Sequence, residues 1–222
     1  MNLIVFDIDD TLTKSEVQHQ LAYINTMKSF GITDIDQNWR EYKHHTDSYI
    51  LKINFENNLK KKFNFSFIPS FEIHMTQLIL GLNKVSEING AKKTIDFFDE
   101  KSNYAIAFAT GSLLEPAYVK LNQAQINYNP NLVVGSNAIY EREGIVSEAI
   151  NRAKSYYQVD VFEHVISVGD GIWDLKTAQN LGLHFIGIGM KNFADFEKEK
   201  INYHIKDWSE FDLKGAEMKL GF

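Results

Sequence analysis

Three aspartates follow an apolar segment at the start of the chain. Leu3 to Phe6 are all apolar and predict a buried strand, and Asp7, Asp9 and Asp10 come directly after it. Carboxylates this close together repel one another when they are ionised. A bound cation removes that repulsion, so the segment FDIDDT indicates a site for positive charge at the end of the strand.

Polar residues also end two later apolar segments. FATGS ends in Thr110 and Ser112, and VGDGIWD supplies Asp170 and Asp174. In open parallel sheets, ligands bind outside the carboxyl ends of the strands. If the three strand ends converge, four carboxylates share one pocket and stay ionised together only around a cation. Oxygen donors without His or Cys nearby favour a hard ion, and Mg²⁺ is the usual one where phosphate also binds.

Short apolar strands alternate with helical patterns after residue 88. This alternation predicts an α/β fold, with a doubly wound, Rossmann-like parallel sheet covered by helices on both faces. The apolar segments are YAIAFA, NLVV, HVISVG and HFIGIG, and the helical patterns cover residues 91–102, 114–126, 143–157 and 173–182.

The chain between the first two motifs has a helical pattern. Residues 14–85 show no strand-like alternation, and Ser15 and Gly31 mark the start and end of a first helix. A βα loop typically has about 2–6 residues, so this insert is too long for one. We expect hinges near Thr13–Lys14 and Val85–Gly90. The predicted domains are an α/β catalytic core, residues 1–13 and 88–222, and a small all-helical cap, residues 14–87.

Composition limits the classes of partner. The net charge is -6 and the sequence pI about 5.6, and the chain has no cysteine. No basic field is present to hold nucleic acid or an anionic membrane, and no apolar run approaches the roughly 18 residues of a membrane span. The lack of cysteine fits a reducing compartment. We expect a cytoplasmic protein without nucleic-acid or membrane partners; the sequence does not indicate its oligomeric state.

Taken in order, the segments FDIDDTLT, AFATGS and VGDGIWD resemble the motifs of the haloacid dehalogenase-like hydrolases. The resemblance covers residues 1–13 and about 88–190, and the long insert looks like the α-helical cap of that family. It implies that Asp7 is a nucleophile that forms an aspartyl-phosphate and that Asp9 is the acid and base. Asp9 favours phosphoryl chemistry, because dehalogenating members lack that acid. Asp10 stands where many relatives carry Gly, and we expect it to cap or turn the chain.

The same resemblance implies the phosphate and metal contacts. Thr110 and Gly111 would bind the transferring phosphoryl group beside a helix start. The family also places a basic residue before its last acidic motif. We prefer Arg142, just before a predicted helix, to Lys154, which lies deep inside it. The implied Mg²⁺ ligands are Asp7, Asp9 through its backbone carbonyl, Asp170 and Asp174.

These implications lead to one expected activity and several alternatives. We expect a Mg²⁺-dependent phosphatase that hydrolyses a small phosphorylated metabolite, a phosphate monoester. A phosphomutase would use the same residues, a phosphonate hydrolase would need an amine from the cap, and a non-catalytic phosphate- or Mg²⁺-binding regulator would keep the fold. Thr46 and Asp47, in the insert segment YKHHTDSY, are candidate substrate contacts; the alternative is an ordinary exposed helix junction.

Overall fold

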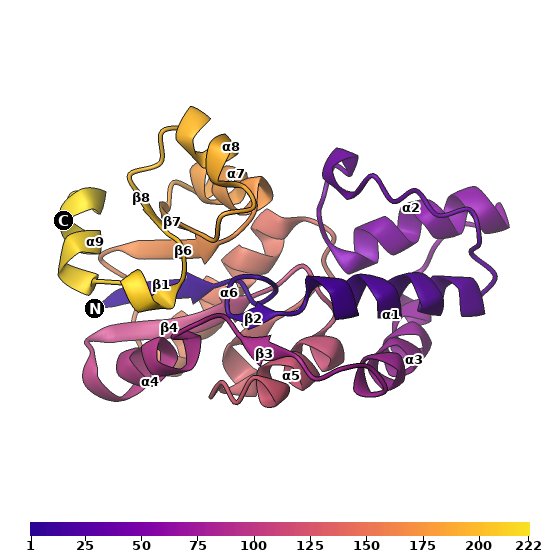
Figure 1. The fold of residues 1–222 in the computed structure, drawn as a ribbon, viewed down its shortest axis with the longest axis horizontal. Coiled ribbons are helices and arrows are strands. Elements are labelled where there is room, and N and C mark those ends of the chain that lie inside the picture. The colour runs from indigo at the N-terminus through magenta and orange to yellow at the C-terminus, as the bar shows by residue number, and fades with distance from the viewer.

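The computed structural model describes the backbone of residues 1–222 and every side chain except that of Lys101. Its centre is a six-stranded sheet in which every pair of neighbouring strands is parallel (Figure 1). The predicted α/β class with a doubly wound parallel sheet is confirmed. The strands, in spatial order, are β5 (Val133–Val134), β4 (Tyr104–Ala109), β1 (Asn2–Phe6), β6 (Val165–Gly169), β7 (His184–Ile188) and β8 (Tyr203–Ile205).

Side chains of the central strands alternate between two apolar cores. On β1, Ile4 and Phe6 belong to one core, and Leu3 and Val5 belong to the other. Because both faces are buried, the strand is a continuous apolar run in the sequence. One face is covered by α4 (Ala91–Lys101), α5 (Leu114–Gln123) and α9 (Leu213–Leu220), and the other by α6 (Arg142–Tyr157), α7 (Ile172–Leu181) and α8 (Phe193–Lys198).

The insert forms a separate group of helices beyond one end of the sheet (Figure 1). It has its own apolar cluster, which includes Met27, Leu51 and Phe71. The chain enters and leaves it through a two-stranded antiparallel ribbon, β2 (Thr13–Lys14) with β3 (Ser86–Glu87), where we expected the hinges. The helices of the insert are α1 (Glu16–Ser29), α2 (Asp47–Leu59) and α3 (Ile68–Leu80), with short 3₁₀ turns at Trp39–Glu41 and Phe65–Phe67.

The start of α1 differs from the sequence-based expectation. Ser15 is the residue before the helix, but its side chain makes no capping hydrogen bond. The Asp10 carboxylate accepts the backbone N–H groups of Ser15 and Glu16 instead, each at 3.2 Å. Asp10 adopts a left-handed conformation with φ 51°, which Asp tolerates better than most residues. Asp10 therefore has the capping role that we expected, and the Ser15 hydroxyl is free to bind elsewhere.

The last thirty or so residues complete the sheet and one core. No helix or strand was predicted there, because β8 has only three residues and gives almost no periodic signal. Trp208, in a 3₁₀ turn at Trp208–Glu210, packs on Phe6 and donates its indole N–H to the Thr11 carbonyl at 2.8 Å. Another 3₁₀ turn lies at Pro130–Leu132. Within the described part of the chain, no helix combines the length and apolar character needed to cross a membrane.

Two glycines with positive φ should respond differently to alanine. Gly90 has φ +84°, and a Cβ there would lie 3.0 Å from the backbone of Trp208 and Ser209. Gly189 has φ +85° but open space around it. We expect Gly189→Ala to lower the free energy of unfolding by about 1 kcal/mol, from backbone strain alone. Gly90→Ala should cost at least about 1 kcal/mol more, because backbone must shift. Chemical denaturation measures both, and equal losses would contradict this packing.

Candidate active site

Three carboxylates meet at the carboxyl edge of the sheet. Asp7 follows β1 and Asp170 follows β6, and these strands pair in parallel with Phe6 opposite Val168. Asp174 lies in the first turn of α7, where one carboxylate oxygen accepts the Gly171 N–H at 3.1 Å. One oxygen from each of the three aspartates lies within 4.8 Å of the others. This cluster could bind a metal ion, and all its side-chain donors are carboxylate oxygens.

Burial disfavours the charged form of all three carboxyls. Burial raises the pKa of the Asp7 carboxyl to about 8, with Arg142 lowering it and Asp174 raising it further. Burial and the neighbouring Asp174 and Asp7 raise the pKa of Asp170 well above its usual value. Burial raises that of Asp174 as well, against the effect of Arg142. A bound cation would let all three carboxylates ionise together.

Arg142 supplies a positive charge next to Asp7 and Asp174. It is the first residue of α6, and its Nη2 lies 2.6 Å from Asp7 Oδ1 and 2.5 Å from Asp174 Oδ1. Lys154, the alternative, lies in the last turn of α6 and does not line the cavity at the cluster. A Cβ on Gly111 would lie 2.6 Å from Arg142 Nη1, so this glycine leaves room for the guanidinium. The structure thus places Arg142 where we expected the basic residue.

The loop after β4 faces the same cavity. Thr110, Gly111 and Ser112 all line it together with the aspartates. The Thr110 N–H donates to the Val134 carbonyl at 2.9 Å, which continues the ladder to β5, and its hydroxyl accepts the Ser112 N–H at 3.0 Å. The loop is therefore held rigidly beside Asp7, as a phosphate-binding loop needs to be. Its contact with phosphate stays a prediction.

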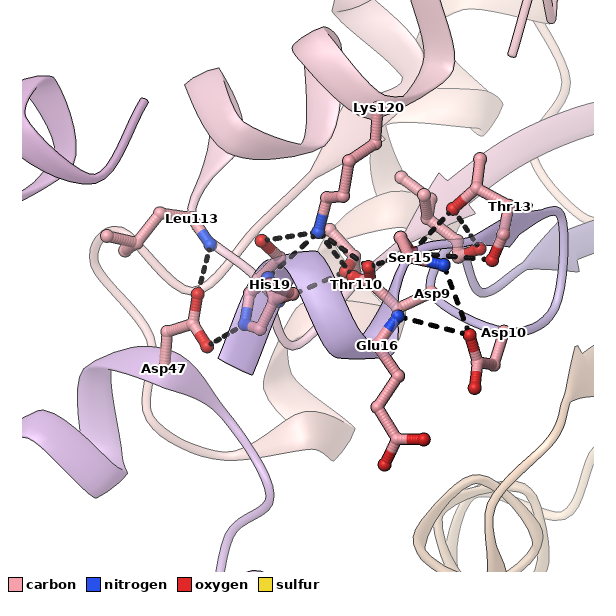
Figure 2. Close-up of polar contacts among 12 residues, drawn as sticks. Asp9, Asp10, Thr13, Ser15, Glu16, His19, Asp47, Thr110, Leu113 and Lys120 are labelled. Atoms are coloured by element: carbon pink, nitrogen blue, oxygen red, sulfur yellow. Dashed lines mark hydrogen bonds and ion pairs between the residues drawn. The ribbon is translucent and has the colours of Figure 1, made fainter. Parts of the chain in front are cut away.

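The Asp9 side chain does not join the cluster. Its two oxygens lie 2.7 and 2.6 Å from Lys120 Nζ, and Oδ1 also accepts the Ser15 hydroxyl at 2.5 Å (Figure 2). Burial raises the pKa of Asp9, but interactions led by the Lys120 ammonium lower it more, to about 2. Asp9 is thus ionised in this arrangement, as a base must be, and must take up a proton before it can act as an acid. The metal role expected of its backbone carbonyl stays a prediction.

Lys120 is a site residue that the sequence analysis missed. It lies on α5 and is completely buried, with its ammonium against Asp9. The available signal was its position in the helix, because Ala117, Leu121 and Ala124 form an apolar stripe at helical spacing that Lys120 interrupts. A lysine in such a stripe needs a buried acidic partner.

The two candidate substrate residues of the insert are buried and line the cavity. Thr46 and Asp47 are 1% and 6% exposed, so the alternative of an exposed helix junction is wrong for them. The Thr46 hydroxyl donates to the Tyr140 carbonyl at 2.8 Å. Asp47 binds His19 and the Leu113 N–H, at 2.9 and 3.0 Å. Both residues join the insert to the core, and their contact with a substrate stays a prediction.

The cavity between sheet and insert has a volume of about 280 Å³. His45 and Trp173 form one wall, with ring centroids 3.7 Å apart and planes 3° from parallel. Burial and Arg142 lower the pKa of His45 to about 3, so its ring is neutral. The insert contributes a mixed aromatic and amide surface. Its lining residues there include Gln20, Tyr23, Gln37, Asn38, Trp39 and Ile50.

Comparison with known proteins identifies the family. Residues 4–188 match the family model described as haloacid dehalogenase-like hydrolase. The chain belongs to the haloacid dehalogenase-like hydrolases. The three strand-end motifs that carry the resemblance all lie within the matched residues. No curated protein sequence matches the chain at a significant level.

Solved structures share the fold across nearly the whole chain. A family IA, variant 3 hydrolase from Entamoeba histolytica superposes with a TM-score of 0.74 at 15% identity, covering 100% of both chains. CbbY from Rhodobacter sphaeroides, in complex with phosphate, has a TM-score of 0.72 at 16% identity and covers 97% of this chain and 98% of its own. A putative β-phosphoglucomutase from Bacteroides vulgatus gives 0.71 at 16%, covering 100% and 91%. At these identities the likeness shows the fold alone.

Mg²⁺ should stabilise the protein more at high pH. The Asp7 pKa is about 8 in the folded protein against 3.8 ordinarily, so between these values the folded state holds more protons than the unfolded one. The free energy of unfolding therefore falls as pH rises through this range. A bound cation removes the repulsion, so the Mg²⁺-induced rise in Tm should be larger at about pH 8 than at about pH 5.5. At about ten times its Kd we expect a rise of about 3–6 °C.

Two variants distinguish a Mg²⁺-induced rise in Tm at the cluster from ion binding elsewhere on the protein. Asp170→Asn removes a ligand and a repelling charge, so the ion-free protein should gain stability at about pH 8 and lose the Mg²⁺ response. Asp160→Asn, at an exposed position outside the cluster, should keep it. Differential scanning fluorimetry measures the shifts. An equal Mg²⁺ response in both variants would refute a metal site in the cluster.

Proposed function

We propose that this chain is a Mg²⁺-dependent phosphatase that hydrolyses a small-molecule phosphate monoester through an aspartyl-phosphate on Asp7. The observation that carries the proposal is the arrangement at the carboxyl edge of the sheet. Asp7 lies in reach of Asp170, Asp174 and Arg142, beside the loop that carries Thr110. This set combines a carboxylate nucleophile, a metal-binding cluster and a guanidinium for the phosphoryl oxygens.

The donor set of the cluster fits Mg²⁺. Asp7, Asp170 and Asp174 offer carboxylate oxygens, which Mg²⁺ prefers. Burial raises the pKa of all three carboxyls, and a bound cation would favour their ionised forms, which supports the proposal. The Asp9 backbone carbonyl would complete the protein ligands. When bound, Mg²⁺ would offset the charge of carboxylates and phosphate, so that one anion can attack another.

The residues of the chain divide the reaction between them. Asp9 first takes up a proton from solvent as the substrate binds. An Asp7 oxygen attacks phosphorus, and the bond from phosphorus to the leaving oxygen breaks as that oxygen takes this proton from Asp9. Water then attacks phosphorus and gives its proton back to Asp9. The bond to Asp7 breaks and free phosphate leaves. Arg142 and Thr110 would hold the phosphoryl oxygens during both displacements, the guanidinium through two parallel hydrogen bonds.

The helical insert suits the role of a cap. Residues of the insert, 14–87, line one side of the cavity. The chain enters and leaves the insert through the two paired strands β2 and β3. Closure would exclude bulk water during attack by Asp7. A cavity of about 280 Å³ fits a small phosphorylated metabolite better than a phosphoprotein. The lack of cysteine supports a cytoplasmic location for the proposed phosphatase.

A phosphomutase is the second candidate. The observation that favours it is the covered cavity, which would let a substrate stay bound while the phosphoryl group returns to it. The products separate the two reactions, because a phosphatase releases phosphate and a mutase yields an isomeric sugar phosphate. ³¹P NMR of a sugar-phosphate panel distinguishes them in one experiment.

Phosphate release tests the proposed activity. With 4-nitrophenyl phosphate and Mg²⁺, the wild-type protein should release phosphate, and EDTA should stop the release. Asp7→Asn should lower kcat at least about 1000-fold, because the amide is not a nucleophile. Asp160→Asn, an exposed aspartate outside the cavity, should stay within about twofold of wild type. Equal release by wild type and Asp7→Asn would contradict the assignment of the nucleophile.

A further inference from the structure

Lys120 occupies an unusual place for a lysine. Among the side chains that the structure describes, it and Arg142 are the buried cations, and Lys120 is 0% exposed. Burying an ammonium group is costly unless every N–H finds a partner. Lys120 Nζ meets both oxygens of Asp9, the Ser112 hydroxyl at 3.1 Å and His19 Nδ1 at 3.1 Å. The ammonium therefore has a complete set of acceptors, all of them beside the cavity.

The contacts of Lys120 determine which ring nitrogen of His19 carries the proton. A lysine ammonium only donates hydrogen bonds, so Nδ1 of His19 must accept and carries no proton. The proton of the neutral ring is then on Nε2, which donates to Asp47 Oδ1 at 2.9 Å. The result is an ordered chain from Asp9 through Lys120 and His19 to Asp47 (Figure 2).

This series of hydrogen bonds passes from the core to the insert and back again. Lys120 belongs to α5 of the core, whereas His19 and Asp47 belong to α1 and α2 of the insert. Asp47 then returns to the core, because its second oxygen accepts the Leu113 N–H at 3.0 Å and its own N–H donates to the Gly111 carbonyl at 2.8 Å. If the insert moved away from the core, His19 would lose Lys120, and Asp47 would lose the backbone of Leu113 and Gly111.

We propose that Lys120 is a positioning residue for Asp9, and that His19 and Asp47 make this positioning depend on the insert being seated on the core. The inference rests on the proposed function, in which Asp9 moves the protons. With the insert seated, Lys120 and Ser15 hold the Asp9 carboxylate in one orientation. Without the His19 contact, the ammonium loses a partner and is free to turn, and Asp9 turns with it.

An aryl phosphate isolates the step that needs Asp9. Attack by Asp7 on 4-nitrophenyl phosphate expels a stable phenolate, which needs no proton from Asp9. Hydrolysis of the aspartyl-phosphate still needs Asp9 to take a proton from water. General bases contribute about 10²–10⁴-fold, and a positioning residue supplies part of that. Stopped-flow measurement of 4-nitrophenolate separates the first step, as a burst, from the second, as the steady rate.

Lys120→Gln should uncouple the two steps. We expect the burst rate constant to stay within about threefold of wild type, and the hydrolysis rate constant to fall at least about tenfold. The burst should approach one equivalent per active site. Lys93→Gln, on the exposed side of α4, should behave as wild type. If Lys120→Gln slows both steps equally, or neither, Lys120 has only a structural role and the proposal is wrong.

His19→Ala tests the link to the insert and does not remove the buried cation. It should show the same pattern as Lys120→Gln with a smaller fall in hydrolysis, and it decides the question if Lys120→Gln does not fold. The double variant should be no slower in hydrolysis than Lys120→Gln alone, because both changes break one chain. Additive losses, or normal hydrolysis in His19→Ala, would overturn the link. Failure of the proposed function looks different, because wild type would then give neither burst nor turnover.

Discussion

The main physical constraint at the carboxyl edge of this sheet is a group of buried carboxylates that repel one another. Asp7, Asp170 and Asp174 are brought within 4.8 Å because β1 and β6 are neighbours in register and α7 begins directly after β6. Arg142 touches two of them and offsets part of the charge. The cluster could bind a metal ion that offsets the rest. The parallel sheet and the glycine beside Arg142 both serve to keep this crowded group in place.

Two cations give two neighbouring carboxylates opposite environments. Asp7 is buried among other acids with Arg142, and its pKa is raised to about 8, whereas Asp9 lies against Lys120 and its pKa is lowered to about 2. The chain has left β1 after Phe6, so the two-residue alternation of a strand no longer applies, and Asp7 and Asp9 contact different partners. Such separation of pKa values is a sign of divided acid, base and nucleophile roles. It supports giving the nucleophile and proton-transfer roles to different aspartates.

The motifs at the strand ends could be predicted because parallel strands place their carboxyl ends at one edge. That reasoning located Asp7, Asp170, Thr110 and the edge that they share. It did not find Lys120 or its contact with His19, because that contact joins a core helix to an insert and has no local sequence pattern. The helices of the insert were predictable from the helical pattern of residues 14–85, although Ser15 does not cap the first of them. Its orientation, which buries Asp47 against the loop after β4, depends on tertiary packing alone.

The most direct test is to find the residue that carries the phosphoryl group. Wild-type protein with Mg²⁺ and 4-nitrophenyl phosphate would be quenched in acid within the burst phase, reduced with borohydride to convert the acyl phosphate, and digested for mass spectrometry. We predict that the reduction product lies at Asp7 and that Asp7→Asn yields none. Modification at Asp9 or Asp170, or turnover with no modified aspartate, would contradict the proposed mechanism.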